Sequence, residues 1–344
     1  MSVPSLLSIF GNSGGGPPIL ISEIFKTNLY TANNSAVTIT NSIDLAGEGG
    51  MVWGKSRSAN QNHRLYDTEG NGLYPNLTAT QFGTSSRFTA NSNGFSLTAA
   101  SGIVGGSGYC GPNYVAWTFR KAPGFFDIVE YTGDGTSTQT INHNLDSVPG
   151  MIMFKNLDSQ ADWHVYHRST TSGYYLRLNS FSGQTNAGGS EFSSLTSSSF
   201  TFDRTYVSNI NTSGVDYVAY IFAHDDARFG TGRDETVIKC DTYNGIASNS
   251  SYSVSCGFKP GWVLIKTLNP SADTTNAPSS PWVIIDNQRS DAAIYPDNSV
   301  EENGYDAGGY GITFTSTGFN IASSNSAVNY GYGRKYVYVA IREP

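Results

Sequence analysis

Charged side chains are scarce in this sequence. Asp, Glu, Lys and Arg make up 14% of its 344 residues, against roughly a quarter in an average soluble protein. The net charge is −7, and no basic stripe could neutralise several phosphates, so we do not expect nucleic-acid binding. No apolar run approaches the ~20 residues of a membrane-spanning helix, so we do not expect membrane insertion either.

Cysteine is also rare. The three cysteines, Cys110, Cys240 and Cys256, are an odd and low number that does not make a disulfide framework. Cys240 and Cys256 could pair, but the favoured interpretation is that they are buried free thiols. Their scarcity fits a protein that assembles in a reducing cytoplasm.

Strong helix formers are sparse, and no long window repeats apolar residues at the helical period of 3.6. The sequence instead has 38 glycines and 13% aromatic residues, together with many Ser, Thr and Asn. Aromatic and β-branched side chains suit a pleated, half-buried surface, and Gly and Asn suit the turns between strands. The composition therefore predicts an all-β protein.

Three similar segments recur along the chain. An apolar hexamer ending in lysine occurs as GMVWGK (50–55), GMIMFK (150–155) and GWVLIK (261–266). Each is followed by a second apolar run: YVAWTF (114–119), YVAYIF (217–222) and YVAI (338–341). The spacing of about 100 residues is too long for a solenoid repeat and suits a small domain, so three tandem domains are predicted.

The boundaries follow from linkers rich in Gly, Pro or charge. Residues 1–20 hold a short apolar patch and the stretch GNSGGGPP (11–18), which we interpret as an attachment arm with a hinge; a disordered terminus is the alternative. The three domains are then predicted at 21–124, 125–224 and 225–344, the last including a linker.

The middle domain shows the strands most clearly. Strand-like runs are expected at 127–132, 137–142, 151–155, 162–168, 174–178, 199–203 and 217–222. The sequence TGDGT (132–136) is interpreted as a hairpin turn between the first two. The run at 151–155 is apolar on both faces, which predicts a central strand. Seven short strands with frequent turns predict antiparallel β-sandwiches, jelly-roll-like in type.

Searches for catalytic and metal-binding patterns identify no site. His164 and His167 are three residues apart, so on a strand they point to opposite faces and cannot share one metal ion; a surface or cross-strand role is expected. The letters GNSGG (11–15) fit a nucleophile elbow but lack its strand and helix. We therefore predict no enzyme activity, no catalytic or metal-binding residues and no cofactor.

A ligand-binding surface is left open. Several tyrosines lie among glycines in the third domain, where they could stack on sugars or pack against the core; packing is favoured. The members of this group are Tyr305, Tyr310, Tyr330, Tyr332 and Tyr336. Glu301 and Glu302 are expected in a solvated loop. No residue can be named as ligand-binding.

The middle domain resembles a β domain of tailed-phage virion proteins, known from tail fibres and other structural proteins of marine phages. The resemblance rests on FDIVEYTGDGTSTQTINHNL (126–145), VPGMIMFKN (148–156), WHVYHR (163–168) and YVAYIF (217–222). It covers roughly residues 125–224, and the other two domains match more loosely. The resemblance implies a virion component and no catalytic residue.

These observations predict a non-enzymatic virion protein, a tail fibre or host-recognition protein, assembled in the host cytoplasm. Its arm would dock to other virion proteins, its domains would project outward, and it would form a homo-oligomer that could bind a host-surface glycan. A capsid decoration or head-fibre protein is one alternative. A secreted carbohydrate-binding protein is another.

Overall fold

Antiparallel strands dominate the computed structural model, which describes residues 17–32, 34–104, 111–203, 209–246, 251–268, 280–289, 292–304, 309–330 and 334–344. Within these residues the helical segments are single turns: η1 (Ile21–Glu23), α1 (Leu45–Glu48) and η2 (Ala99–Ser101). The prediction of an all-β sandwich fold is confirmed. The domain boundaries stay predictions, and below we use units defined by the sheets.

The first unit combines a main sheet with a smaller second sheet. The main sheet has the order β1-β9-β3-β4-β5-β6 and the second sheet the order β2-β8-β7. The strands are β1 (Phe25–Thr31), β2 (Val37–Thr40), β3 (Gly50–Ser56), β4 (Arg64–Asp67), β5 (Asn71–Leu73), β6 (Phe82–Gly83), β7 (Phe88–Asn91), β8 (Gly94–Leu97) and β9 (Asn113–Arg120).

The second unit repeats this arrangement strand for strand. Its main sheet has the order β10-β18-β12-β13-β14-β15 and its second sheet the order β11-β17-β16. The strands are β10 (Phe126–Thr132), β11 (Thr140–Asn142), β12 (Met151–Asn156), β13 (His164–His167), β14 (Tyr174–Arg177), β15 (Thr185–Asn186), β16 (Phe192–Leu195), β17 (Ser199–Phe202) and β18 (Asp216–Phe222). All seven predicted strands are present, and β15 and β16 were not predicted.

The third unit keeps the same order with a shorter main sheet, β21-β27-β23-β24, and a second sheet, β22-β26-β25. Its strands are β21 (Ile238–Asn244), β22 (Tyr252–Ser255), β23 (Pro260–Thr267), β24 (Val283–Asp286), β25 (Ile312–Thr315), β26 (Gly318–Ile321) and β27 (Lys335–Arg342). A small hairpin of β19 (Ala227–Phe229) and β20 (Glu235–Thr236) lies between the second and third units.

The predicted hairpin at TGDGT (132–136) is wrong. Strand β10 before it pairs with β18 in the main sheet, whereas β11 after it pairs with β17 in the second sheet. The Asp134 carboxylate accepts hydrogen bonds from the backbone nitrogen and hydroxyl of Thr136, which tightens the loop locally. The segment therefore carries the chain from one layer of the sandwich to the other.

The register of the third repeat also differs from the sequence alignment. Tyr30 and Tyr114 stack as neighbours on β1 and β9, and Tyr131 and Tyr217 do so on β10 and β18. The equivalent stacked pair in the third unit is Tyr243 with Tyr336, so Tyr336, and not Tyr338, corresponds to Tyr114.

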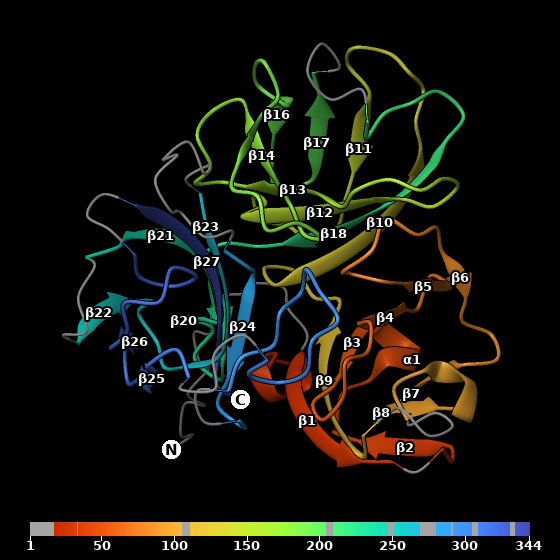
Figure 1. Cartoon of the computed structure of the whole chain (residues 1–344). Helices are drawn as coiled ribbons and strands as arrows, with labels where there is room; N and C mark the ends of the chain where they lie inside the picture. The colour runs from red at the N-terminus through yellow and green to blue at the C-terminus, as the bar shows by residue number, and fades with distance from the viewer. Residues whose placement is uncertain are drawn as a thin grey trace, which may run out of the picture.

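The apolar hexamers form central strands with both faces buried, as predicted for residues 151–155. In β23, Val263 and Ile265 face the core inside the third sandwich, while Trp262 and Leu264 face a second core shared by all three units. Figure 1 shows the units as three lobes, the first at lower right, the second at the top and the third at left, meeting at this shared core. The three sandwiches thus form one body.

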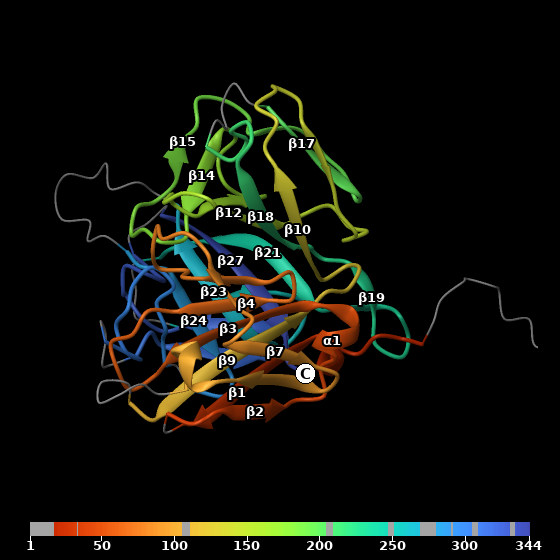
Figure 2. The ribbon, with the colours of Figure 1, turned by 90° about the vertical axis from the view of Figure 1, so that its right-hand side faces the viewer.

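The connections between units gather in one region. The backbone nitrogen of Gly230, in the linker after the second unit, donates to the carbonyl of Ile19 before β1, and Ala223 donates to Phe125 at the start of the second unit. In Figure 2 the first described residues lie beside β19 and α1. Since the main strands β1, β10 and β21 all begin here, we call this region the joint.

Candidate functional site

Several of the buried polar side chains in the described part of the chain lie at the interfaces between the units. Each hexamer ends in a lysine that is fully buried: Lys55, Lys155 and Lys266. The Lys155 ammonium donates to the carbonyl of Thr78 in the first unit at 3.3 Å, and that of Lys266 donates to the carbonyl of Ser180 in the second at 2.8 Å. Buried charges need such partners. Burial lowers the pKa of Lys155 to about 8.

The same lysines also fasten the loop that follows their own strand. The acceptors there are backbone carbonyls: Ser56 and Ala59 for Lys55, Asn156 and Ala161 for Lys155, and Ser280 for Lys266. The lysine at the end of each hexamer therefore holds a loop in place in all three units and ties two of the units to a neighbour.

A second equivalent position closes the units into a ring. Trp163 Nε1 of the second unit donates to the carbonyl of Tyr74 in the first, and Trp282 Nε1 of the third donates to that of Arg177 in the second. His63 occupies this position in the first unit, and its Nε2 lies 2.9 Å from the carbonyl of Tyr295 in the third. The second unit thus contacts the first, the third contacts the second, and the first contacts the third, so the three units form a closed ring.

The environment of His63 sets its protonation. Trp53 Nε1 donates to His63 Nδ1 at 2.9 Å, so Nδ1 carries no proton and Nε2 donates to Tyr295. Burial and the neighbouring Lys55 charge hold the pKa of His63 well below its usual value. His63 is therefore a neutral part of the interface.

A third equivalent position, the last residue of β4, β13 and β24, also contacts the next unit. Asp67 accepts a hydrogen bond from the Tyr220 hydroxyl at 2.6 Å, and His167 Nε2 contacts the carbonyl of Tyr338 at 3.2 Å. Asp286 accepts from Trp117 Nε1. Burial raises the pKa of Asp67 and lowers that of His167 to about 4.

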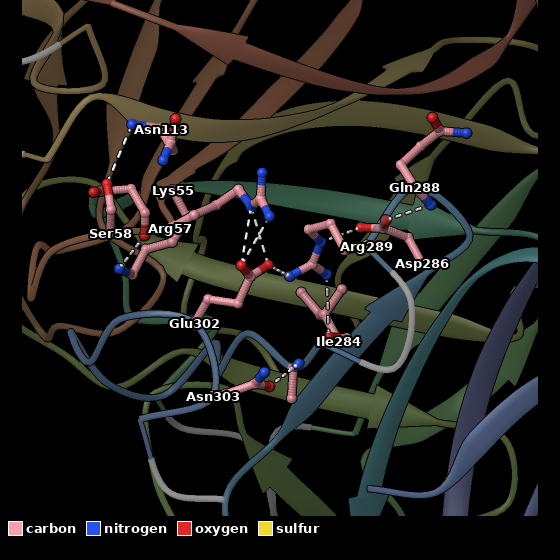
Figure 3. Close-up of polar contacts among 12 residues, drawn as sticks. Lys55, Arg57, Ser58, Asn113, Ile284, Asp286, Gln288, Arg289, Glu302 and Asn303 are labelled. Carbon is pink, nitrogen blue, oxygen red and sulfur yellow. Dashed lines mark hydrogen bonds and ion pairs between the residues drawn. The ribbon is translucent and has the colours of Figure 1, made fainter. Parts of the chain in front are cut away.

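A network of alternating charges joins the first and third units (Figure 3). Arg57 forms a two-pronged hydrogen bond with Glu302, at 2.9 Å for the shorter prong. Glu302 also contacts Arg289, whose Nε lies 2.8 Å from Asp286. The guanidinium of Arg289 lies over the ring of Trp117, 5.5 Å from its centroid. The network therefore holds together the first and third units, which are far apart in sequence.

The structure corrects several expectations from the sequence. His164 and His167 point to opposite faces of β13 as predicted, but both are buried, His164 against Glu191 and His167 against the third unit. Glu301 is exposed as expected for a solvated loop, whereas Glu302 lies between two arginines. Cys240 and Cys256 are buried free thiols, as favoured, whereas Cys110 lies outside the described residues.

Of the five tyrosines named from the sequence of the third domain, some are buried and one is partly exposed. Tyr310 and Tyr336 are buried, with hydroxyls bonded to Tyr295 and to the carbonyl of Ser326, so they pack in the core as favoured. Tyr330 is 38% exposed under the guanidinium of Arg334. Tyr305 and Tyr332 lie outside the described residues.

Two open clefts lie at unit boundaries. One, of about 720 Å³, lies at the joint and is lined by the first described residues, Arg120 and the linker residues Asp226 and Arg228. The other, of about 410 Å³, lies between the first two units and is lined by Glu69, Glu130 and Asp216 among others.

No group of three or more His, Cys, Asp or Glu in the described part of the chain could hold a metal ion. No described helix is long and apolar enough to cross a membrane.

The interface residues occupy positions that repeat from unit to unit in the sequence. The lysine recurs at the sixth place of each hexamer, and the first and third units share Tyr-Pro followed by Asn76 or Asp297. These two residues, and Asn179 in the second unit, accept a hydrogen bond from the backbone nitrogen of the ring-closing position. A polar residue that recurs at the same place of an otherwise apolar pattern is therefore the sequence signal that marks these interface residues.

Comparison with known proteins gives one assignment. Residues 21–344 match the family described as Domain of unknown function (DUF7483), and the chain belongs to this family. The matched region starts at η1 and runs through all three units, in agreement with their shared core. No curated protein matches the chain.

Proposed function

We propose that this DUF7483 protein is a non-enzymatic structural protein of a tailed-phage particle, a tail fibre or host-surface recognition protein. The observation that carries the proposal is the closed ring of contacts among the units, in which each unit donates to a backbone carbonyl of another. A body closed in this way keeps its shape under load and presents its loops in fixed positions. The resemblance of residues 125–224 to virion β domains supports the same proposal.

The buried ionisable groups support a mechanical role. Lys155, Lys266, Asp67 and Asp286 each bond to another unit, and Arg289 supports Asp286 from within the third unit. Burying charges is costly unless each one is paired, so these residues serve to fix the arrangement of the units.

The chain path supports attachment through the N-terminal end. The joint, where every unit begins, contacts the first described residues through Ile19. The loops after β3 and β12 lie at the far ends of strands that start near the joint. Residues 1–20 would dock to other virion proteins, and the far loops would face the host surface, where a glycan is the proposed partner. Assembly would take place in the host cytoplasm.

Deleting residues 1–16 tests the attachment, because it leaves Ile19 and the rest of the joint intact. The truncated chain should keep the melting temperature of the full chain but be missing from purified particles. A matched control replaces residues 2–10 by a Gly/Ser stretch of equal length, which should also be missing, since the apolar patch and not the length is needed. Undiminished incorporation of either variant would contradict the attachment role.

Binding of the truncated body to host cells tests recognition. The labelled body should bind host cells, compete with particle adsorption, and lose binding when the cells are stripped of surface glycans. Native mass spectrometry of the full chain should show a homo-oligomer. A body that neither binds cells nor slows adsorption would favour a capsid decoration role over host recognition.

A further inference from the structure

Lys266 and Asp297 form a fully buried pair inside the third unit. The Lys266 Nζ lies 3.9 Å from Asp297 Oδ2, and both side chains are 0% exposed. The ring of Trp282 lies against the pair, with its centroid 5.7 Å from Nζ. The pair is held on both sides, because Nζ donates to two backbone carbonyls and Oδ2 accepts from the Trp282 nitrogen at 2.8 Å.

Comparison of the three units shows that the carboxyl group is not needed for the fold. Asn76 and Asn179 stand at the position of Asp297 and accept the same backbone hydrogen bond, at 3.1 and 2.9 Å. An amide therefore serves as well as an acid in this role. This position holds an amide in the first two units and a carboxyl group in the third, where it faces the buried Lys266 as a reactive partner.

Burial favours the uncharged forms of both groups. It lowers the pKa of Lys266 to about 8 and raises that of Asp297 to about 7, because the protein interior solvates a charge poorly. A neutral amine is a nucleophile, and a neutral carboxylic acid can be attacked at its carbon. Holding the two groups together replaces a bimolecular encounter by an intramolecular step.

We propose that Lys266 and Asp297 condense to an intramolecular amide bond. Nζ attacks Asp297 Cγ, the C–Oδ1 bond breaks, and Oδ1 leaves as water, taking one proton from the amine and keeping the acid proton. No oxidant, reductant or cofactor is consumed. The amide retains one N–H, which can still donate to one of the two carbonyls that Lys266 contacts.

The surrounding groups suit this step. The backbone nitrogen of Trp282 donates to Oδ2, the oxygen that stays, and would stabilise the negative charge that develops on it during attack. The Asn298 amide lies 3.4 Å from Oδ1, the leaving oxygen. The bond would join the end of β23 to the segment after β24 and so lock residues 266–297 into a covalent loop. Such a link would resist mechanical unfolding of the third unit.

Mass spectrometry of the full chain under denaturing conditions tests the proposal. The wild-type mass should be one water below that of the sequence, and a peptide map should contain a single branched peptide joining Lys266 to Asp297. Lys266→Met should restore the full mass. The matched control, Lys155→Met, removes the equivalent lysine of the second unit and should leave the water loss unchanged.

Two results would overturn the proposal: a wild-type mass equal to that of the sequence, or a water loss that persists in Lys266→Met. The wild-type peptide map decides the question even where a variant fails to fold. It also separates this bond from a cyclised Asp or Asn elsewhere, because only the amide yields the branched peptide.

Discussion

The indole nitrogen of Trp117 donates a hydrogen bond to the carboxylate of Asp286 across 2.9 Å, although 169 positions of sequence separate the two residues. Trp117 lies on β9 of the first unit and Asp286 on β24 of the third, so the bond joins these two units directly. The same carboxylate pairs with Arg289, and both residues belong to the network that Figure 3 shows. The contact between the first and third units therefore depends on the Asp286 carboxylate.

Asp286→Asn should lower the free energy of unfolding by about 3–5 kcal/mol, because it breaks a buried ion pair and leaves Glu302 as the remaining carboxylate partner of Arg289. The control Glu343→Gln breaks the exposed pair with Lys259 and should cost less than about 1 kcal/mol. Urea unfolding measures both. Equal losses in the two variants would show that the buried network does not close the body.

Gly50→Ala should destabilise the protein by roughly 3 kcal/mol or more, since a strained backbone angle and overpacking add together. Gly50 has a φ of 152°, and an added Cβ would lie 2.1 Å from the carbonyl oxygen of Phe119. Gly83 has open space around its Cα, so Gly83→Ala is the matched control and should be nearly neutral. Thermal unfolding followed by circular dichroism distinguishes them, and a stable Gly50→Ala would refute the packing argument.

Two tryptophans differ in whether the indole nitrogen is bonded. Trp282 Nε1 donates to the Arg177 carbonyl, whereas Trp262 Nε1 has no hydrogen-bond partner in the described part of the chain. Trp282→Phe should therefore cost about 1–3 kcal/mol more than Trp262→Phe, because it leaves a buried carbonyl unpaired. Denaturant titration of both variants measures the difference. A larger loss in Trp262→Phe would contradict the ring-closing role of Trp282.

The stability of the protein should depend on pH through His167. Burial lowers its pKa from the usual 6.5 to about 4, so between these values the unfolded chain binds a proton that the folded chain does not. The folded state should therefore lose about 1.4 kcal/mol per pH unit from this residue as the pH falls from 6.5 to 4.

His167→Gln isolates this contribution, because glutamine does not titrate. Asp67, whose pKa is raised by burial, acts in the opposite direction, and it does so equally in both proteins. The unfolding free energies of wild type and variant, measured from pH 7 to pH 4, should converge on acidification. Parallel curves would show that His167 binds a proton in the folded state as readily as in the unfolded chain, and so would contradict the lowered pKa.

The positions of the strands could be predicted because their signal is local. Residues 151–155 are apolar on both faces and flanked by turn residues, and they form β12 in the middle of its sheet. The pairing of the strands could not be predicted in the same way. TGDGT (132–136) has the letters of a hairpin turn, yet β10 and β11 lie in different layers, since pairing is decided by partners about 60 to 90 residues away.

The positions of the interface residues could be read from the sequence, but their burial between units could not. Lys155 ends an apolar run, and the sequence does not show that the first unit covers it and supplies the carbonyl of Thr78. Glu302 was expected in a solvated loop, but Arg57 of the first unit pairs with it and leaves only 16% of its side chain exposed. Solvent exposure depends on the packing of the units, which no local pattern encodes.

Composition and local pattern by themselves determined the all-β class, the positions of the main strands in the middle unit and the double-sided burial of residues 151–155, because these follow from periodicity over a few residues. The tertiary structure alone decided that the three sandwiches share a core and close into a ring. That closure depends on single contacts such as Trp163 with Tyr74, between residues whose separation in the chain hides their proximity. Burial then decided which polar groups are charged, since desolvation acts only once the units have met.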